Sequence, residues 1–173
     1  CSCGKADCDS PGKHPLTPTG CLAATTDADQ VVKWWTTNPS ANIGVATGPQ
    51  SGVWVLDIDG DDGIVDLQRL VEEHGELPEG PITVTGGGGR HVWFKYPADR
   101  TISNAAKHHG KSIDVRGAGG YVLVAPSNHS SGAAYEWKPG LDEDLPEAPS
   151  WLLDWIDSGR SNGKAATAAN GSP

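Results

Sequence analysis

The segment that most constrains the fold of this chain is an apolar run that ends in two carboxylates. Residues 53–58 are hydrophobic except for Asp57, and Asp59 follows directly after Ile58. Because side chains alternate along a β-strand, we expect Asp57 and Asp59 to share one face while Ile58 points into the core. Two acids this close repel each other unless a cation lies between them. Carboxylate oxygens suit Mg²⁺, Mn²⁺ or Ca²⁺, so the pair predicts a metal site.

The acidic pair is compatible with several kinds of site. The simplest is an exposed acidic turn after a strand. An EF-hand is excluded, since its loop needs Gly and Glu where this chain has Asp62 and Gln68. Phosphatases of the haloacid dehalogenase type also have a strand that ends Asp-x-Asp-Gly, with the first Asp as nucleophile. Thr or Val usually comes next in them, whereas this chain has Asp61. Two-metal phosphoryl or nucleotidyl transfer needs a further carboxylate and a phosphate-binding group downstream.

A candidate phosphate-binding loop follows the acidic pair. A short expected strand at 82–85 leads into four consecutive glycines, which include Gly88 and Gly89. Without a Cβ, the backbone N–H groups of such a loop can approach an anion closely. Arg90 and His91 open the next expected strand. A flexible hairpin loop accounts for the glycines equally well when they are considered alone.

The further carboxylate is Asp114. It lies between Ile113 and Val115 in another expected strand. An acid with apolar neighbours on both sides is uncommon unless it is paired or bound to a metal. The acidic pair, the glycine loop with its histidine and the isolated acid therefore indicate one site when they are taken in order.

This order of motifs resembles the archaeo-eukaryotic primase superfamily. The segment Asn-Ile-Gly-Val-Ala-Thr-Gly at 42–48 narrows the likeness to the bifunctional primase/polymerase (prim-pol) domains of phage and plasmid replication proteins. The segments Asp-Val-Arg-Gly at 114–117, Gly-Gly-Tyr-Val at 119–122 and Ala-Pro-Ser at 125–127 point the same way. Relatives often carry Ser or Lys just before the motif histidine, where this chain has glycines. Phosphate contacts would then come from backbone N–H groups, His91 and Arg90.

The resemblance implies an α+β fold, with a largely antiparallel, RRM-like mixed sheet as the catalytic core and flanking helices. It implies a nucleotidyltransferase that acts as a DNA-directed primase/polymerase. The residues it assigns are two-metal ligands (Asp57, Asp59 and Asp114, with Mg²⁺ or Mn²⁺), a phosphate ligand (His91) and weaker nucleotide-pocket candidates (Arg116 and Ser127). The implied partners are single-stranded DNA template, primer and nucleoside triphosphates, in the cytoplasm of a bacterial host.

The N-terminus carries a separate pattern, Cys1-x-Cys3-x4-Cys8-x5-His14. Three thiolates and an imidazole at this spacing, with Gly and Pro between them, fit a small tetrahedral Zn²⁺ knuckle. Cys21 would replace Cys1 if Cys1 is not a ligand. Disulfides and a lipid-modified Cys1 are the alternatives, and a reducing cytoplasm disfavours the disulfides.

Composition limits the possible partners. The net charge is −9, which leaves no basic footprint for tight independent DNA binding. No apolar run approaches the roughly 20 residues that a membrane span requires. The chain contains no Met, which favours a fragment of a longer protein, with a C-terminal helicase or other replication domain.

The pattern of the whole chain predicts three units. Residues 1–20 form the zinc knuckle, residues 21–158 the catalytic domain and residues 159–173 a flexible linker or tail. In the second unit, Trp34 and Trp35 belong to the apolar face of a short helix, and Trp151 to Ile156 form a helical stripe that docks on the core. Two other functions remain open, a phosphatase that uses Asp57 and a non-catalytic, zinc-bearing nucleic-acid-binding module.

Overall fold

The computed structural model describes residues 3–138 and 144–168, and the side chains up to Gly159. Five strands form an antiparallel sheet in the order β5-β2-β4-β3-β7, and β1 pairs with β6 in a separate two-stranded ribbon. The elements in chain order are a 3-10 helix (Gly20–Ala23), α1 (Ala28–Thr37), β1 (Ile43–Thr47), β2 (Val53–Ile58), α2 (Gly60–His74), β3 (Ile82–Val84), β4 (Arg90–Lys95), a second 3-10 helix (His108–Gly110), β5 (Ile113–Arg116), β6 (Gly120–Val124), β7 (Glu136–Trp137) and α3 (Ser150–Ala168). This is the mixed α+β, antiparallel class that the sequence predicts.

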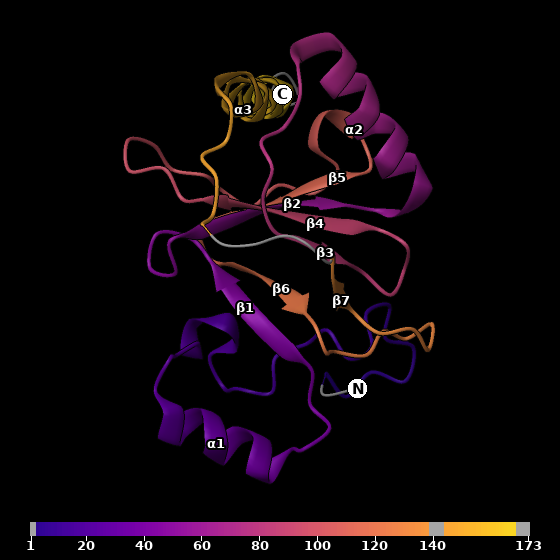
Figure 1. The fold of residues 1–173 in the computed structure, drawn as a ribbon, viewed down its shortest axis with the longest axis vertical. Coiled ribbons are helices and arrows are strands. Elements are labelled where there is room, and N and C mark those ends of the chain that lie inside the picture. The colour runs from indigo at the N-terminus through magenta and orange to yellow at the C-terminus, as the bar shows by residue number, and fades with distance from the viewer. Residues whose placement is uncertain (1–2, 139–143, 169–173) are drawn as a thin grey trace, which may run out of the picture.

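The sheet lies between two layers. Helices α2 and α3 lie on one of its faces, and the β1–β6 ribbon lies on the other, with α1 beyond the ribbon (Figure 1). The side chains of β2 alternate between the two faces, and all six residues of this central strand are buried. The sheet therefore has a different environment on each side.

The larger core lies between the sheet and the helices. Trp54 and Phe94 stack there with ring centroids 4.7 Å apart. Leu152 and Ile156 of α3 are 0% and 1% exposed and belong to the same cluster. The predicted docking of the Trp151–Ile156 stripe on the core is confirmed.

A smaller core lies on the opposite face, under the ribbon. Val53, Val55 and Trp93 of the sheet pack there against Val122 and Val124 of β6. This packing holds the ribbon over one end of the sheet. Asp57 lies further along β2 than Val55, on the same face, because residues two apart in a strand point the same way.

The helix ends follow local rules. The Asp27 side chain caps α1 by accepting a hydrogen bond of 2.8 Å from the Gln30 N–H. Helix α2 ends at His74 and is followed by Gly75, which has a φ of +110°. Helix α3 continues through Ala168, past Ser158, where composition predicted the start of a linker. Helix propensity is a weak guide at such positions, and the division into three units stays a prediction.

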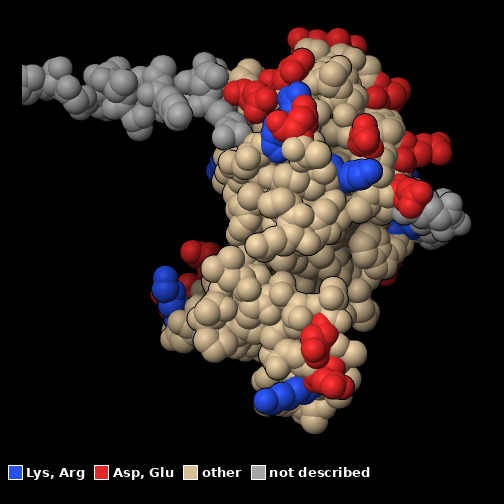
Figure 2. Space-filling model, turned by 90° about the vertical axis from the view of Figure 1, so that its left-hand side faces the viewer, with Lys and Arg blue, Asp and Glu red and all other residues tan. Residues whose placement is uncertain are grey.

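The charges are unevenly distributed over the surface. In the view of Figure 2, acidic side chains gather over the top, where α2 and α3 lie, and the middle of this face carries little charge. None of the described helices has the length and apolarity that crossing a membrane would require.

Candidate active site and metal cluster

Strand register brings three of the predicted site residues into one row. Asp57 on β2 lies opposite His91 on β4 and opposite Asp114 on β5. Residues directly opposite in antiparallel strands point to the same side of the sheet. All three are buried, at 9%, 5% and 7% exposure, on the face that carries the ribbon. We call Asp57, His91, Asp114 and their partner Arg116 the acid row.

Arg116 joins the two carboxylates of the acid row. Its Nη2 donates to Asp57 Oδ2 at 3.0 Å and to Asp114 Oδ2 at 2.6 Å, and its Nε donates to the same Asp57 oxygen at 3.1 Å. The backbone N–H of Lys107 donates to the other oxygen of Asp114 at 2.7 Å. A cationic group thus lies between the two buried acids Asp57 and Asp114.

His91 contacts the second oxygen of Asp57, with 3.4 Å between Nε2 and Oδ1. Burial alone would raise the pKa of Asp57, but the His91 hydrogen bond and the charges of His91 and Arg116 outweigh it, so the pKa is lowered. The other ring nitrogen, His91 Nδ1, is buried without a hydrogen-bond partner among the described residues. The ring packs beside Tyr135, with centroids 6.1 Å apart.

Asp59 lies one residue beyond the end of β2, next to the acid row. It immediately precedes α2, is exposed, and its extended backbone donates from N–H to the Ser112 carbonyl at 2.9 Å. Partial desolvation, followed by repulsion from Asp57 and Asp114, raises its pKa. This repulsion means that bringing the three carboxylates together costs free energy when no cation is bound.

The glycine loop is a tight turn between β3 and β4. Gly88 N–H donates to the Thr85 carbonyl and Gly89 N–H to the Thr85 hydroxyl, both at 3.0 Å. The loop packs so closely against the end of β2 that a Cβ on Gly89 would collide with the Ile58 carbonyl. The N–H groups of Gly88 and Gly89 donate within the turn, and an anion would have to compete with Thr85 for them.

Two predicted residues lie apart from the row. Arg90 is exposed and pairs with Ile58, so by alternation it points to the opposite face of the sheet from His91. Ser127 is buried, and its hydroxyl accepts a hydrogen bond from the Ile43 N–H at 2.8 Å. This bond joins β1 to the end of β6, which gives Ser127 a structural contact.

Two residues of the site carry no sequence signal of their own. Lys107 supplies a backbone N–H to Asp114 from a left-handed conformation with a φ of +48°. Tyr135 is 3% exposed, and its pKa is raised by burial and by the charges of Asp57 and Asp59. Lys107 reaches Asp114 from seven residues away through its left-handed backbone, and Tyr135 packs beside His91 from a distant segment, so neither contact follows from a simple periodic pattern.

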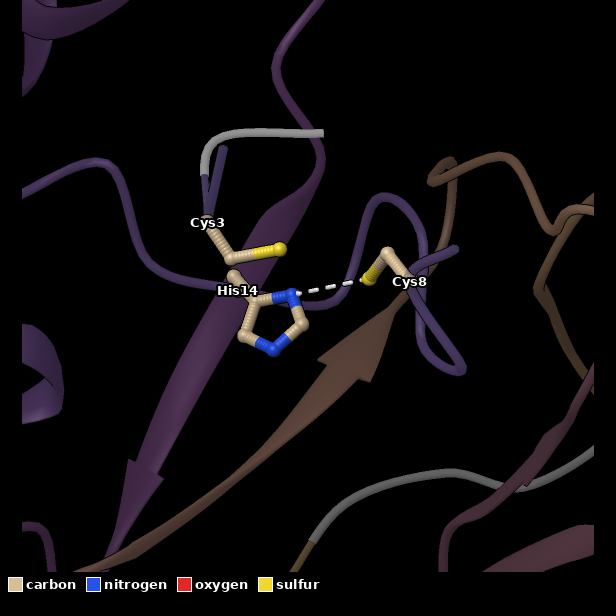
Figure 3. Close-up of side chains that lie close together, drawn as sticks. All are labelled: Cys3, Cys8 and His14. Carbon is tan, nitrogen blue, oxygen red and sulfur yellow. Dashed lines mark hydrogen bonds between the residues drawn. The ribbon is translucent and has the colours of Figure 1, made fainter. Parts of the chain in front are cut away.

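The N-terminal segment gathers three of the predicted metal ligands. Cys3, Cys8 and His14 point toward one another (Figure 3), with ligand atoms that all lie within 4.8 Å of one another. Cys8 Sγ lies 3.6 Å from His14 Nδ1. The pKa of the Cys3 thiol is lowered, mainly by a hydrogen bond from the Lys5 backbone and less strongly by a hydrogen bond with the Cys8 side chain. Soft thiolates and an imidazole at this separation can hold Zn²⁺.

The fourth ligand is not among the described residues of this cluster. Cys1 lies outside the described residues, and Cys21 donates instead to the Gly119 carbonyl at 3.4 Å. No disulfide joins any two of the described cysteines. Within the described part of the chain, no other group of three or more His, Cys, Asp or Glu gathers this tightly, so Asp57, Asp59 and Asp114 are more widely spaced.

The knuckle is attached to the ribbon by two hydrogen bonds. The Asn42 side chain donates to the Gly12 carbonyl at 3.1 Å, and the Tyr121 hydroxyl donates to the Lys13 carbonyl at 2.8 Å. The charge of Lys13 acts on Asp59, where it opposes the rise in pKa.

Comparison with known proteins agrees with this geometry. Residues 6–151 match the model of the family described as bifunctional DNA primase/polymerase, N-terminal. Comparison with curated proteins gave no match. The matched segment contains every described strand, the acid row, and both Cys8 and His14. The chain therefore belongs to the bifunctional DNA primase/polymerase (Prim-Pol) family.

Proposed function

We propose that the acid row is the active site of a primase/polymerase that adds nucleotides to a primer or to an initiating nucleotide on single-stranded DNA. Family membership supports a DNA primase/polymerase-type function with DNA and nucleotides as substrates. The observation that carries the finer proposal is the placement of Arg116 between Asp57 and Asp114. The two buried carboxylates attract positive charge, and Mg²⁺ or Mn²⁺ would take over carboxylate oxygens that Arg116 engages in the metal-free structure.

The donor set fits divalent ions. Asp57, Asp59 and Asp114 supply carboxylate oxygens from β2, the start of α2 and β5, and such hard ligands suit Mg²⁺ or Mn²⁺. Two ions held there would neutralise the triphosphate, lower the pKa of the attacking hydroxyl and stabilise the leaving pyrophosphate. The pKa of Asp59 is raised by desolvation and then by repulsion from Asp57 and Asp114, and the same repulsion would be relieved by a bound cation.

The protein's own cations would position the triphosphate. His91 Nε2 lies 3.4 Å from Asp57 Oδ1, so its ring could donate to a phosphate oxygen bound beside Asp57. The side chain of Arg116 is 34% exposed, so its guanidinium can donate to an anion that arrives from solvent. Arg90 and Ser127 have weaker support as nucleotide ligands, since one points to the other face and the other bonds to Ile43.

We further propose that Cys3, Cys8 and His14 hold a structural Zn²⁺, with Cys1 as the fourth ligand. Support comes from the spacing of their ligand atoms and from the lowered pKa of the Cys3 thiol. The hydrogen bond of Cys21 to Gly119 supports Cys1 rather than Cys21 as the fourth ligand.

A phosphatase that uses Asp57 as nucleophile has less support. Both Asp57 oxygens are engaged, one by His91 and the other by Arg116. The decisive experiment is incorporation of a radiolabelled nucleotide on primed and unprimed single-stranded DNA, with Mg²⁺ or Mn²⁺. A polymerase extends the primed template, a phosphatase releases phosphate without incorporation, and a non-catalytic module does neither.

A further inference from the structure

A cavity of about 700 Å³ lies between the N-terminal segment, α1 and the ribbon. Trp34 and Trp35 of α1 form one wall, and Tyr121 and Leu123 of β6 form another. The strand β1 contributes only small residues, Gly44 and Ala46. No residue of α1 is buried, so the apolar face of this helix borders the cavity and not a closed core.

The ribbon separates this cavity from the acid row. Ile43, Val45, Val122 and Val124 pack on the sheet, whereas the alternate residues Gly44, Ala46, Tyr121 and Leu123 line the cavity. Because neighbouring residues of a strand point to opposite faces, the cavity and the sheet lie on opposite sides of the ribbon. A nucleotide whose phosphates bind at Asp57 would therefore not place its base in the cavity. A polymer could reach both places.

The charge of the lining differs from that of the whole chain. The chain has 22 Asp and Glu against 13 Lys and Arg. Yet none of the described residues that line the cavity is acidic, and they include Lys13, His14 and His129. Indole faces for stacking, beside a cation and without acids, are the features that bind unpaired bases and their phosphates.

We infer that this cavity binds an unpaired base of the single-stranded template, an inference that rests on the proposed function. The Trp35 indole is held by a hydrogen bond of 3.0 Å from Nε1 to the Ala41 carbonyl, which fixes one aromatic wall. The backbone of Lys13 is held by Tyr121, which fixes the side next to the knuckle. Because His14 belongs to both the metal cluster and the cavity lining, the intact knuckle completes the site.

The test compares two labelled oligodeoxynucleotides of equal length, one with bases and one abasic, by fluorescence anisotropy at low salt. The full chain with its zinc is used. Trp34→Ala should weaken binding of the base-bearing strand about fivefold or more, because one stacked base is lost. Binding of the abasic strand should not change. Trp137→Ala is the matched control, since Trp137 is 47% exposed on β7 and does not line the cavity.

A second variant tests the cavity without removing an aromatic ring. A Cβ on Gly44 would meet its nearest neighbour, Tyr121 Cδ2, at 3.8 Å, an ordinary contact. Gly44→Leu should therefore fold and fill the cavity, with the same loss of base-dependent binding. If both Trp34→Ala and Gly44→Leu bind the base-bearing strand as the wild type does, or if the wild type binds neither strand, the inference is wrong.

Failure of this inference can be told apart from failure of the proposed function. Asp57→Ala should keep the base-dependent binding and lose nucleotide incorporation. If the wild type extends primers while both Trp34→Ala and Gly44→Leu bind normally, the cavity assignment fails and the function stands. If base-dependent binding depends on Trp34 but no nucleotide is incorporated, the function fails and the cavity still binds single strands.

Discussion

The acid row and the N-terminal knuckle hold their ligand groups in opposite ways. In the row, Asp57 and Asp114 lie on paired strands whose neighbouring residues Leu56, Ile113 and Val115 are 0% exposed. In the knuckle, none of the residues from 3 to 15 is buried. Strand pairing positions the carboxylates before any ligand binds, whereas the thiols and imidazole have almost no core beneath them.

Because of this difference, substitutions in the acid row should affect binding and catalysis, and substitutions in the knuckle should affect local folding. Removal of an acid should change what the row can bind while the sheet stays folded. Removal of a thiol should change the local structure itself, because a small metal site supplies the folding free energy of its own segment. Substitutions in the two regions should therefore have different consequences.

The largest expected effect is the loss of activity in Asp57→Ala. If the row holds catalytic ions, losing a ligand removes several kcal/mol of transition-state stabilisation, so incorporation should fall on the order of 10³-fold or more. Asp59→Ala should behave in the same way. Circular dichroism should show an intact fold in both. Asp61→Ala is the control, because Asp61 is an exposed acid on the next turn. Full activity in Asp57→Ala would contradict the two-metal proposal. A phosphoryl group trapped on Asp57 of the wild type would favour the phosphatase.

Next in size is the effect of metal loss on the knuckle. Elemental analysis of protein purified without added metal should find about one Zn²⁺ per chain. Chelation, or Cys3→Ser with Cys8→Ser, should release it and disorder the segment up to about Pro15, as limited proteolysis would show. Primer extension should survive, since the acid row has its own core, while unprimed initiation should fall.

The control for zinc loss is Cys21→Ser, which should keep the metal because Cys21 bonds to Gly119. A chain without zinc, with its cysteines paired as disulfides, would contradict both the metal site and a reducing compartment.

A smaller effect is expected for His91→Ala. A lost charge-assisted hydrogen bond to phosphate costs about 1.5–3 kcal/mol, which should raise the KM for nucleotide about 10- to 150-fold with a lesser effect on kcat. Steady-state kinetics on a primed template measures both constants. His74→Ala is the control, because His74 is the last residue of α2 and stacks on Trp151, away from the acid row. An unchanged KM would mean that His91 has only a structural role.

The smallest effects concern the stability of the metal-free protein. The pKa of Asp57 is lowered in the fold, so its ionised form stabilises the fold above the ordinary carboxyl range, and this contribution is lost as pH falls. Asp57→Asn should therefore cost about 1–3 kcal/mol near pH 7 and progressively less at acidic pH.

Asp59 should behave with the opposite sign. Its pKa is raised in the fold, so its ionised form opposes folding at neutral pH. Asp59→Asn should stabilise the metal-free protein near pH 7, and the gain should disappear as pH falls and Asp59 becomes protonated. Urea unfolding at neutral and acidic pH, with a chelator present, measures both variants. Equal signs for the two variants would contradict the opposite directions of their pKa shifts.

Much of the fold follows from local patterns. The strand at 53–58 is found where the apolar run predicts it. Side-chain alternation predicts that Asp57 faces away from Ile58. The metal cluster also follows from spacing alone, because Cys8 and His14 are close in the chain.

Other parts of the site could not be predicted in this way. Arg90 and His91 are adjacent, and only the pairing of Arg90 with Ile58 shows which face each of them takes. The resemblance suggests a nucleotide-pocket role for Ser127, yet its hydroxyl is engaged by Ile43, which is distant in the chain. Tyr135 reaches the site from the segment just before β7, without any local signal.

The sequence by itself determined the chemical groups of this protein and their local directions, because backbone alternation and ligand spacing depend only on neighbouring residues. It specified a strand that ends in two acids, a glycine turn before a histidine, and a compact set of thiols with an imidazole. The tertiary structure alone decided that Arg116 lies between Asp57 and Asp114, and that the ribbon leaves a cavity beside Trp34. Both depend on contacts between segments far apart in the chain, whose geometry is set by the packing of the whole fold.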